Sequence, residues 1–191
     1  MLKYDEELNW PFAGVDEVGR GCVAGPVVAC ALVLPIRCKI EGVRDSKKLT
    51  KKQRAELEKK IIAASESFSF GTVDAEEIDE TNILIATLKA MSIAISGLKI
   101  SPKTVLVDGT HAPDCKYPVV CLKSGDSLSL TVAAASILAK EYRDRMMREV
   151  CEQFPEYGFS AHKGYGTKKH FEAITRHGLC SLHRKTFLKK I

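Results

Sequence analysis

The sequence lacks a hydrophobic run long enough to cross a membrane. Its longest uncharged stretch covers residues 21–36 and is interrupted by two prolines, whereas a membrane-spanning helix needs about 20 apolar residues. The N-terminal residues include Asp5, Glu6 and Glu7 and do not form a signal peptide. We therefore expect a cytoplasmic protein that does not associate with membranes.

The sequence also lacks any CxxC pair, repeat or low-complexity segment. Its seven cysteines are an odd number, which argues against a disulfide framework and a zinc knuckle. Reduced thiols in a cytosolic protein are the simplest explanation. With 45% hydrophobic and 28% charged residues, the chain has the composition of a globular protein. Its 191 residues fit one domain with a small appendage.

Positive charge is present but unevenly distributed. Residues 140–191 carry 12 Lys and Arg against 6 Asp and Glu, whereas the rest of the chain carries 17 against 18. A basic region suggests binding to a nucleic-acid backbone or another polyanion. The alternative is an ordinary solvated surface, and charge alone favours that alternative.

The hydrophobic pattern predicts alternating strands and helices. Apolar, partly β-branched runs at residues 12–18 and 27–34, bounded by Gly and Pro, predict a hairpin. Further strands are expected at 67–73, 104–107 and 117–122, helices at 50–64, 83–98, 131–153 and 168–177, and irregular structure at 36–45 and 154–166. A hairpin followed by alternating helices and strands predicts an α/β fold with a mixed sheet.

Residues 14–21, which read GVDEVGRG, place two carboxylates among apolar neighbours. Asp16 and Glu17 are costly there unless a cation or hydrogen-bond donors compensate them. The glycines at 19 and 21 allow backbone N–H groups to approach a ligand, and Arg20 between them can hold a phosphate. The segment therefore predicts a metal site beside a loop that binds a polyanion.

Two further acids occupy positions where α/β proteins form their sites. Asp108 ends a predicted strand, and Asp126 precedes a long helix. Carboxylate oxygens suit Mg²⁺ or Mn²⁺, and two such ions about 3.5–4 Å apart promote phosphodiester cleavage.

Simpler roles remain open for each acid. Asp108-Gly109 is a common turn pair, and Asp126 could cap a helix. Asp16 and Glu17, as strand neighbours, should point to opposite faces. Spacing alone favours these simpler roles.

Six sequence blocks, in order along nearly the whole chain, carry a family resemblance. After GVDEVGRG they are DSKKL at 45–49, VDG at 107–109, GD at 125–126 with AAASILAK and RD at 133–144, HKGYGT at 162–167 and HRKTF at 183–187. Together they resemble the ribonuclease HII family of type 2 ribonucleases H, in its bacterial form. The last block departs slightly, because Thr186 stands where Ser is frequent.

The resemblance implies an RNase H-like fold, a mixed β-sheet flanked by helices with a small C-terminal helical extension. Residues 1–150 are then the catalytic domain, and residues 151–191 a basic extension that contributes to substrate binding. The implied activity is cleavage of the RNA strand of RNA/DNA hybrids and incision 5′ to single ribonucleotides embedded in duplex DNA. Two-metal hydrolysis would leave 3′-hydroxyl and 5′-phosphate ends. We expect a monomer.

The resemblance also implies residue roles. The catalytic, metal-binding acids would be Asp16, Glu17, Asp108 and Asp126, with Mg²⁺ or Mn²⁺ as cofactor. The substrate-binding residues would be Gly19, Arg20 and Gly21 at the ribose 2′-hydroxyl, Tyr165 against the adjacent deoxyribose, and Lys47 and Lys48 at phosphates. These roles suit a sequence-independent enzyme, because the 2′-hydroxyl distinguishes RNA from DNA and phosphate contacts carry no base information.

Simpler readings exist here too. Tyr165 could be a loop aromatic that packs on the body, and Lys47 and Lys48 could be solvated. Two other classes of protein also compete: a non-catalytic hybrid-binding protein and a metal-dependent phosphatase for small substrates. Uncompensated acids would repel a phosphate backbone in the former, and the latter leaves the basic C-terminal region unexplained.

Overall fold

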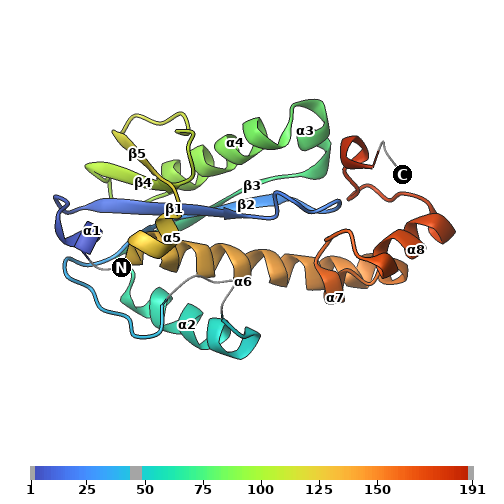
Figure 1. Cartoon of the computed structure of the whole chain (residues 1–191), viewed down its shortest axis with the longest axis horizontal. Coiled ribbons are helices and arrows are strands. Elements are labelled where there is room, and N and C mark those ends of the chain that lie inside the picture. The colour runs from blue at the N-terminus through green and yellow to red at the C-terminus, as the bar shows by residue number, and fades with distance from the viewer. Residues whose placement is uncertain (1–2, 44–48, 189–191) are drawn as a thin grey trace.

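The computed structural model describes residues 3–43 and 49–188, which form three layers with a sheet in the middle (Figure 1). The sheet order is β3-β2-β1-β4-β5. The strands are β1 (Phe12–Val18), β2 (Val27–Val33), β3 (Ser67–Val73), β4 (Thr104–Asp108) and β5 (Val119–Leu122). β1, β2 and β3 pair antiparallel, whereas β4 runs parallel to both β1 and β5. The predicted mixed α/β sheet is confirmed.

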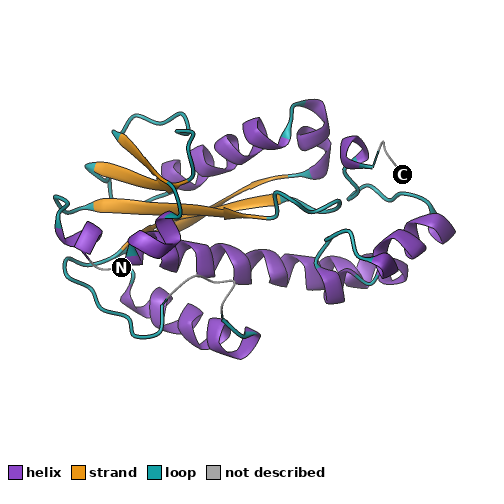
Figure 2. Cartoon of the chain, in the orientation of Figure 1, coloured by secondary structure: helices purple, strands orange, loops and turns teal. Residues whose placement is uncertain are grey.

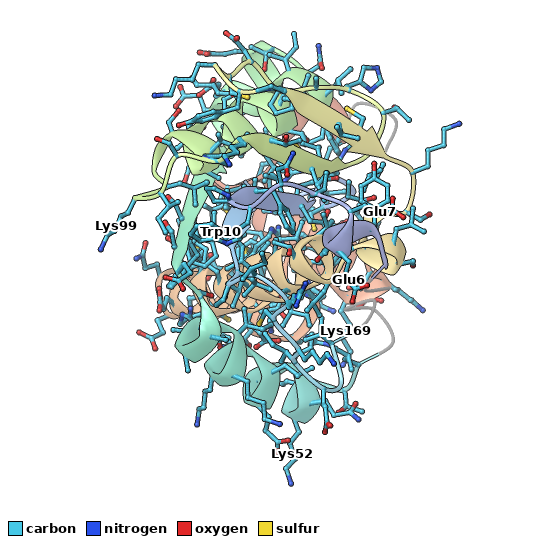
Figure 3. All side chains as sticks on the ribbon, turned by 90° about the vertical axis from the view of Figure 1, so that its left-hand side faces the viewer. Glu6, Glu7, Trp10, Lys52, Lys99 and Lys169 are labelled. Atoms are coloured by element: carbon cyan, nitrogen blue, oxygen red, sulfur yellow. The ribbon has the colours of Figure 1, made fainter. Side chains whose placement is uncertain are left out.

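Helices cover both faces of this sheet (Figure 2). The α-helices are α1 (Lys3–Glu6), α2 (Lys51–Ala64), α3 (Ala75–Glu80), α4 (Ile83–Ser96), α5 (Gly125–Leu128), α6 (Leu130–Gln153), α7 (Phe159–His162) and α8 (Lys168–His177), and the 3-10 turns are η2 (Pro155–Tyr157) and η3 (Lys185–Phe187). α4 lies on one face and α6 on the other, with α2 beyond α6 (Figure 1). Seen from the end that carries α1, Lys52 projects from α2 away from the sheet, whereas Glu6 and Glu7 lie beside α1 (Figure 3).

Strand alternation separates the two cores. Val15 and Ala29 belong to the cluster against α4, whereas Cys30 and Leu32 belong to the cluster against α6. Gly14 allows α6 to approach closely, because an added Cβ there would lie 2.5 Å from a backbone carbon of the helix. The face of β1 that carries Gly14 therefore packs closely against α6.

The predicted helix starts are confirmed by their caps. Thr50 and Gln53 form a capping box at α2, and the Asn82 side chain accepts from the backbone at the start of α4. Thr167 caps α8 in the same way. Hydrogen-bonding side chains at these positions explain why the boundaries could be read from the sequence.

The prediction missed several short elements. α3 is a separate helix that Asp74 caps. The segment at 154–166, predicted to be irregular, contains η2 and α7, which Gly158 and Lys163 terminate in left-handed conformations. A helix of one or two turns has too little hydrophobic periodicity to be recognised.

The C-terminal segment packs on the far end of α6. Met147 of α6 shares a core with Tyr157, Phe159 and Ala173, and Ala24 from the β1–β2 turn joins that core. The turn extends toward α7 and the C-terminal segment (Figure 1). Within the part of the chain that the structure describes, no helix has the length and apolarity needed to span a membrane.

Candidate active site

Three of the four predicted acids line one cavity of about 290 Å³. Asp16 and Glu17 come from β1, and Asp108 ends β4. Parallel pairing sets Val15 opposite Val107, so the following residues, Asp16 and Asp108, are neighbours at the same end of the sheet. The sheet register is therefore what brings acids from distant parts of the sequence together.

Asp16 lies on the sheet face that α6 covers. It is paired across the hairpin with Cys30, which belongs to the core cluster against α6. The Glu17 backbone N–H donates to Asp16 Oδ1 at 2.7 Å, and the Ser136 hydroxyl of α6 also hydrogen-bonds to Asp16. These two donors fix the carboxylate at the wall of the cavity.

Glu17 reaches the same cavity although its strand position belongs to the other face. Its partner in the register, Ala29, belongs to the core cluster against α4. The strand pairing is regular through Val18, so no bulge is needed for the two acids to share the cavity. Glu17 stands one residue from the strand end, and its Oε1 lies 3.3 Å from Arg20 Nη1.

Burial and mutual repulsion make the charged forms of Asp16 and Glu17 costly. Burial raises the pKa of Asp16 well above its ordinary value, and the charges of Glu17 and Asp108 raise it further. Burial also raises the pKa of Glu17, although Arg20 opposes the shift. Glu17 Oε2 is buried without a hydrogen-bond partner among the described residues. Buried oxygens of this kind fit Mg²⁺ or Mn²⁺, which prefer carboxylate ligands.

Asp126 lies beside this cavity but does not line it. It is buried in α5, and the backbone N–H of its neighbour Gly125 donates to Asp108 Oδ1 at 2.7 Å. Within residues 3–43 and 49–188, no three His, Cys, Asp or Glu side chains are grouped closely enough to hold a metal ion by themselves. Divalent ions such as Mg²⁺ usually keep several waters or substrate oxygens, so the protein need not supply a full set of ligands.

The Gly-Arg-Gly loop follows the acids directly. Gly19 has a φ of +95°, and an added Cβ would lie 2.4 Å from Arg143 Nε. Gly21 is exposed, with no heavy atom within 4 Å of where a Cβ would be. Glycine at 19 is thus required by the fold, whereas glycine at 21 leaves the backbone open to solvent beside Arg20.

Tyr165 stands at the rim of the acid cavity and is 42% exposed. Burial raises the pKa of its hydroxyl, which also hydrogen-bonds to Cys22. It lines a second cavity of about 440 Å³ with Lys51 and Lys163. The structure therefore brings Tyr165 to the acids, and a basic cavity lies next to it. Lys47 and Lys48 lie outside the described residues.

Sequence reasoning assigned no role to two buried arginines. Arg143 and Arg184 have no exposed surface and donate to backbone carbonyls, mainly those of the turn between β1 and β2. Both residues stand in the sequence blocks that carry the resemblance. Their partners are carbonyl groups rather than acids, so no charge pattern in the sequence could reveal them.

Two cations that line the acid cavity, Arg54 and Lys140, form ion pairs with buried acids of α6. Arg54 Nε of α2 lies 2.7 Å from Glu141 of α6, and Lys140 Nζ lies 2.5 Å from Asp144. Arg54 also donates to the carbonyl of Leu49 at 2.8 Å. Arg54 thereby fixes α2 and Leu49 against α6.

The solved structures that this chain resembles share its architecture. Ribonuclease H2 from Pyrococcus horikoshii superposes with a TM-score of 0.76 at 30% identity, covering 92% of each chain. Bst-RNase HIII, solved in complex with Mn²⁺, gives a TM-score of 0.79 at 18% identity over 99% of this chain and 74% of its own, a likeness of fold alone. With the acids at the sheet end, this fold defines an RNase H-like protein.

Sequence comparison narrows that class. The family model for ribonuclease HII matches residues 13–190. Ribonuclease HII from Chlamydia abortus is 52% identical over 176 residues, which is 92% of this chain and 82% of the relative. The chain belongs to the ribonuclease HII family, and it is a nuclease with ribonuclease H activity.

Proposed function

We propose that this enzyme incises duplex DNA 5′ to a single embedded ribonucleotide, and cleaves the RNA strand of RNA/DNA hybrids, by two-metal phosphodiester hydrolysis. The observation that carries this proposal is the arrangement of Asp16, Glu17 and Asp108 around one cavity with Tyr165 at its rim. The products are a 3′-hydroxyl and a 5′-phosphate.

The acids would hold Mg²⁺ or Mn²⁺ through carboxylate oxygens. Asp16, Glu17 and Asp108 face the cavity, and Asp126 would complete the set from α5. When bound, the ions supply activation of the attacking water and stabilisation of the negative charge on the phosphate. Ser136 and the Glu17 N–H orient Asp16, and the Gly125 N–H orients Asp108. The Mn²⁺ bound to Bst-RNase HIII supports the choice of cofactor.

The Gly-Arg-Gly loop and Tyr165 would recognise the step from ribose to deoxyribose. The open backbone at Gly21 can both donate to and accept from the 2′-hydroxyl, while Arg20 binds a neighbouring phosphate. Gly19 provides the turn that presents them. The Tyr165 ring would pack on the next sugar, which lacks the hydroxyl. Lys47 and Lys48 are proposed as phosphate contacts on the basis of the resemblance alone.

We further propose the organisation in which this activity operates. Residues 1–150 would form the catalytic domain, and residues 151–191 would contribute to substrate binding. The enzyme would act as a monomer on hybrids and ribonucleotide-containing DNA in the cytoplasm. The seven cysteines are all free, as expected of a reducing compartment.

The test is an Asp16→Asn variant assayed with Mg²⁺ or Mn²⁺ on a duplex that contains one ribonucleotide. We expect loss of at least about 100-fold in rate, because a metal-binding carboxylate is removed. Asp114→Asn is the matched control, since Asp114 is exposed and does not line the cavity. Near wild-type incision by the Asp16 variant would contradict the proposed site. Binding without any turnover in the wild type would favour a pure hybrid-binding protein.

A further inference from the structure

We propose that His183 and Arg184, adjacent in the sequence, are positioning residues that hold the Gly-Arg-Gly loop and Tyr165 in register with each other. This inference rests on the proposed function of those two elements. The C-terminal segment would thus set the geometry of the sensor for the ribose-to-deoxyribose step, besides any charge it offers to the substrate.

Arg184 holds the loop side of the sensor. Its Nη1 donates to the Arg20 carbonyl at 3.0 Å, and its Nε and Nη2 donate to the Gly25 carbonyl at 3.0 and 2.8 Å. The side chain is fully buried and pairs with no carboxylate among the described ion pairs. Burying a guanidinium is costly. Arg184 offsets this cost by donating to two carbonyls of one loop, so we infer that it fixes the position of that loop.

His183 holds the tyrosine side through a second histidine. The Cys180 N–H donates to His183 Nδ1 at 2.9 Å, so the proton of a neutral His183 is on Nε2. That Nε2–H faces His170 Nε2 at 3.1 Å, and His170 Nδ1 faces the Tyr165 carbonyl at 2.9 Å. Only one proton arrangement satisfies all three contacts: each neutral ring donates once and accepts once. The relay runs from Cys180 to Tyr165 without a gap.

The environment keeps both rings in this neutral form. Burial lowers the pKa of His170 to about 4 and also lowers that of His183. His162 stacks on His170 with ring centroids 4.3 Å apart and adds to the shift. At neutral pH the donor and acceptor roles of the relay are therefore fixed.

The backbone completes the connection between the two sides. Gly25 N–H donates to the Leu182 carbonyl at 2.8 Å, Arg184 N–H donates to the Val23 carbonyl at 2.9 Å, and Val23 N–H donates to the Gly164 carbonyl at 2.9 Å. The β1–β2 turn thus lies between the C-terminal segment and the segment before Tyr165. Gly164 has to be glycine, because an added Cβ would lie 2.2 Å from the Ala24 carbonyl oxygen.

This arrangement has a functional consequence. Displacement of about 1 Å at a site that reads a single hydroxyl group is enough to reduce rates by about 100-fold. Groups that touch the substrate need supporting groups that fix them. His183 and Arg184 support both halves of the sensor from one short segment, so a change in either should alter substrate preference rather than chemistry in general.

Two pairs of variants test the inference in the full-length enzyme. For the histidine relay, His183→Asn keeps an acceptor for the Cys180 N–H but does not reach His170, whereas His183→Gln places an amide donor near the position of Nε2. We expect His183→Asn to lower, by about tenfold or more, the ratio of kcat/KM on a single-ribonucleotide duplex to kcat/KM on a uniform RNA/DNA hybrid. His183→Gln should restore most of that ratio.

For the loop, Arg184→Lys keeps the charge but not the three-point contact. We expect it to bring the ratio of Kd for an all-DNA duplex to Kd for the ribonucleotide-containing duplex, measured without divalent metal, close to one. Tyr157→Phe is the matched control, because it keeps the aromatic ring against His183 and removes only the hydrogen bond from the hydroxyl to the Gly178 carbonyl. It should lower Tm while leaving both ratios unchanged.

The outcomes separate the two proposals. Wild-type enzyme that shows no preference for the ribonucleotide-containing duplex would overturn the proposed function. A wild-type preference that survives in both His183→Asn and Arg184→Lys would overturn the positioning role alone. Equal ratios for His183→Asn and His183→Gln, both below wild type, would contradict the hydrogen-bond relay.

Discussion

At Asp16, the requirements of stability and of function oppose each other. Burial of the carboxylate raises its pKa, and the negative charges of Glu17 and Asp108 raise it further. A protein selected for stability alone would place a neutral side chain there, because like charges at short distance repel. Strained ionisable groups in a cavity are typical of active sites.

Removing the charge at Asp16 should therefore stabilise the metal-free protein. We expect Asp16→Asn to raise the free energy of unfolding by about 1 kcal/mol, measured by urea denaturation with a chelator present. Mg²⁺ or Mn²⁺ should raise Tm in the wild type, because a ligand that binds only the folded state stabilises it, and should do so less in the variant. A variant that is less stable than wild type without metal would contradict this account of the site.

Replacing two glycines next to the site should have different effects on stability and on substrate binding. We expect Gly164→Ala to destabilise the protein by about 2–4 kcal/mol, since its φ is +85° and a Cβ would meet the Ala24 backbone. Gly21→Ala should change stability by less than about 0.5 kcal/mol, yet raise KM, because the proposed function places the substrate in the open space that the new methyl group would fill. Thermal denaturation and kinetics on the same samples check both. Unchanged KM in Gly21→Ala would show that the substrate does not approach there.

At the scale of elements, α8 and the C-terminal segment depend on two neutral histidines. If His170 were protonated, its Nε2 could no longer accept the hydrogen bond from His183 Nε2–H. The two N–H groups would then repel each other. Unfolded histidine has a pKa of 6.5, whereas His170 in the fold is lowered to about 4. The unfolded chain therefore binds more protons between these values, and stability falls as pH falls through that window.

We expect the wild type to lose stability between about pH 6.5 and pH 4, and His183→Gln to lose less of it. The C-terminal segment should open first, so its amides should exchange hydrogen faster at pH 5 than at pH 7 when normalised for intrinsic rates. Groups that face His170 are His162, His183 and the Tyr165 carbonyl. A stability curve that is flat from pH 7 to pH 4.5 would contradict the neutral relay.

The long elements could be predicted from the sequence because their signals are local. Strand periodicity and capping side chains such as Thr50 and Asn82 act within a few residues. α3 and α7 were missed because each is only one or two turns long. The predicted hairpin of β1 and β2 is confirmed, but the pairing of β1 with β4 could not be predicted, because it joins strands far apart in the sequence.

The residues of the candidate site also fall into those that the sequence predicts and those that it does not. Acids next to glycines and at strand ends are visible in the sequence, and the structure brings Asp16, Glu17 and Asp108 to one cavity. Asp16 and Glu17 belong to opposite faces of β1, yet both line the cavity, and Glu17 stands one residue from the strand end. The structural roles of Arg143 and Arg184 could not be predicted from the sequence, because their partners are carbonyl groups of a distant turn. Long-range backbone contacts leave no trace in composition or spacing.

For the whole molecule, not all of the excess positive charge near the C-terminus lies on the surface. Arg143 and Arg184 are fully buried and bind carbonyls of the β1–β2 turn, so neither is available to a phosphate. Surface cations that line the cavity beside Tyr165 include Lys51 and Lys163. We therefore expect α2 and the segment after α7 to form the substrate surface together, with Arg143 and Arg184 in a structural role.

Salt dependence of binding tests this surface. We expect Lys51→Ala to reduce the slope of log K against log salt by about one, because one phosphate contact is lost. Lys52→Ala is a closely matched control, since Lys52 neighbours Lys51 in the sequence but projects away from the sheet (Figure 3). Equal slopes for wild type and Lys51→Ala in fluorescence anisotropy would exclude this cavity from the nucleic-acid path.

The most direct test of the central claim is to map the cut on a labelled duplex with one embedded ribonucleotide. The account predicts a single incision immediately 5′ to the ribonucleotide, with 3′-hydroxyl and 5′-phosphate ends, that requires Mg²⁺ or Mn²⁺ and is abolished by Asp16→Asn. A cut at another position, cleavage that persists in a chelator, or full activity of the Asp16 variant would contradict it.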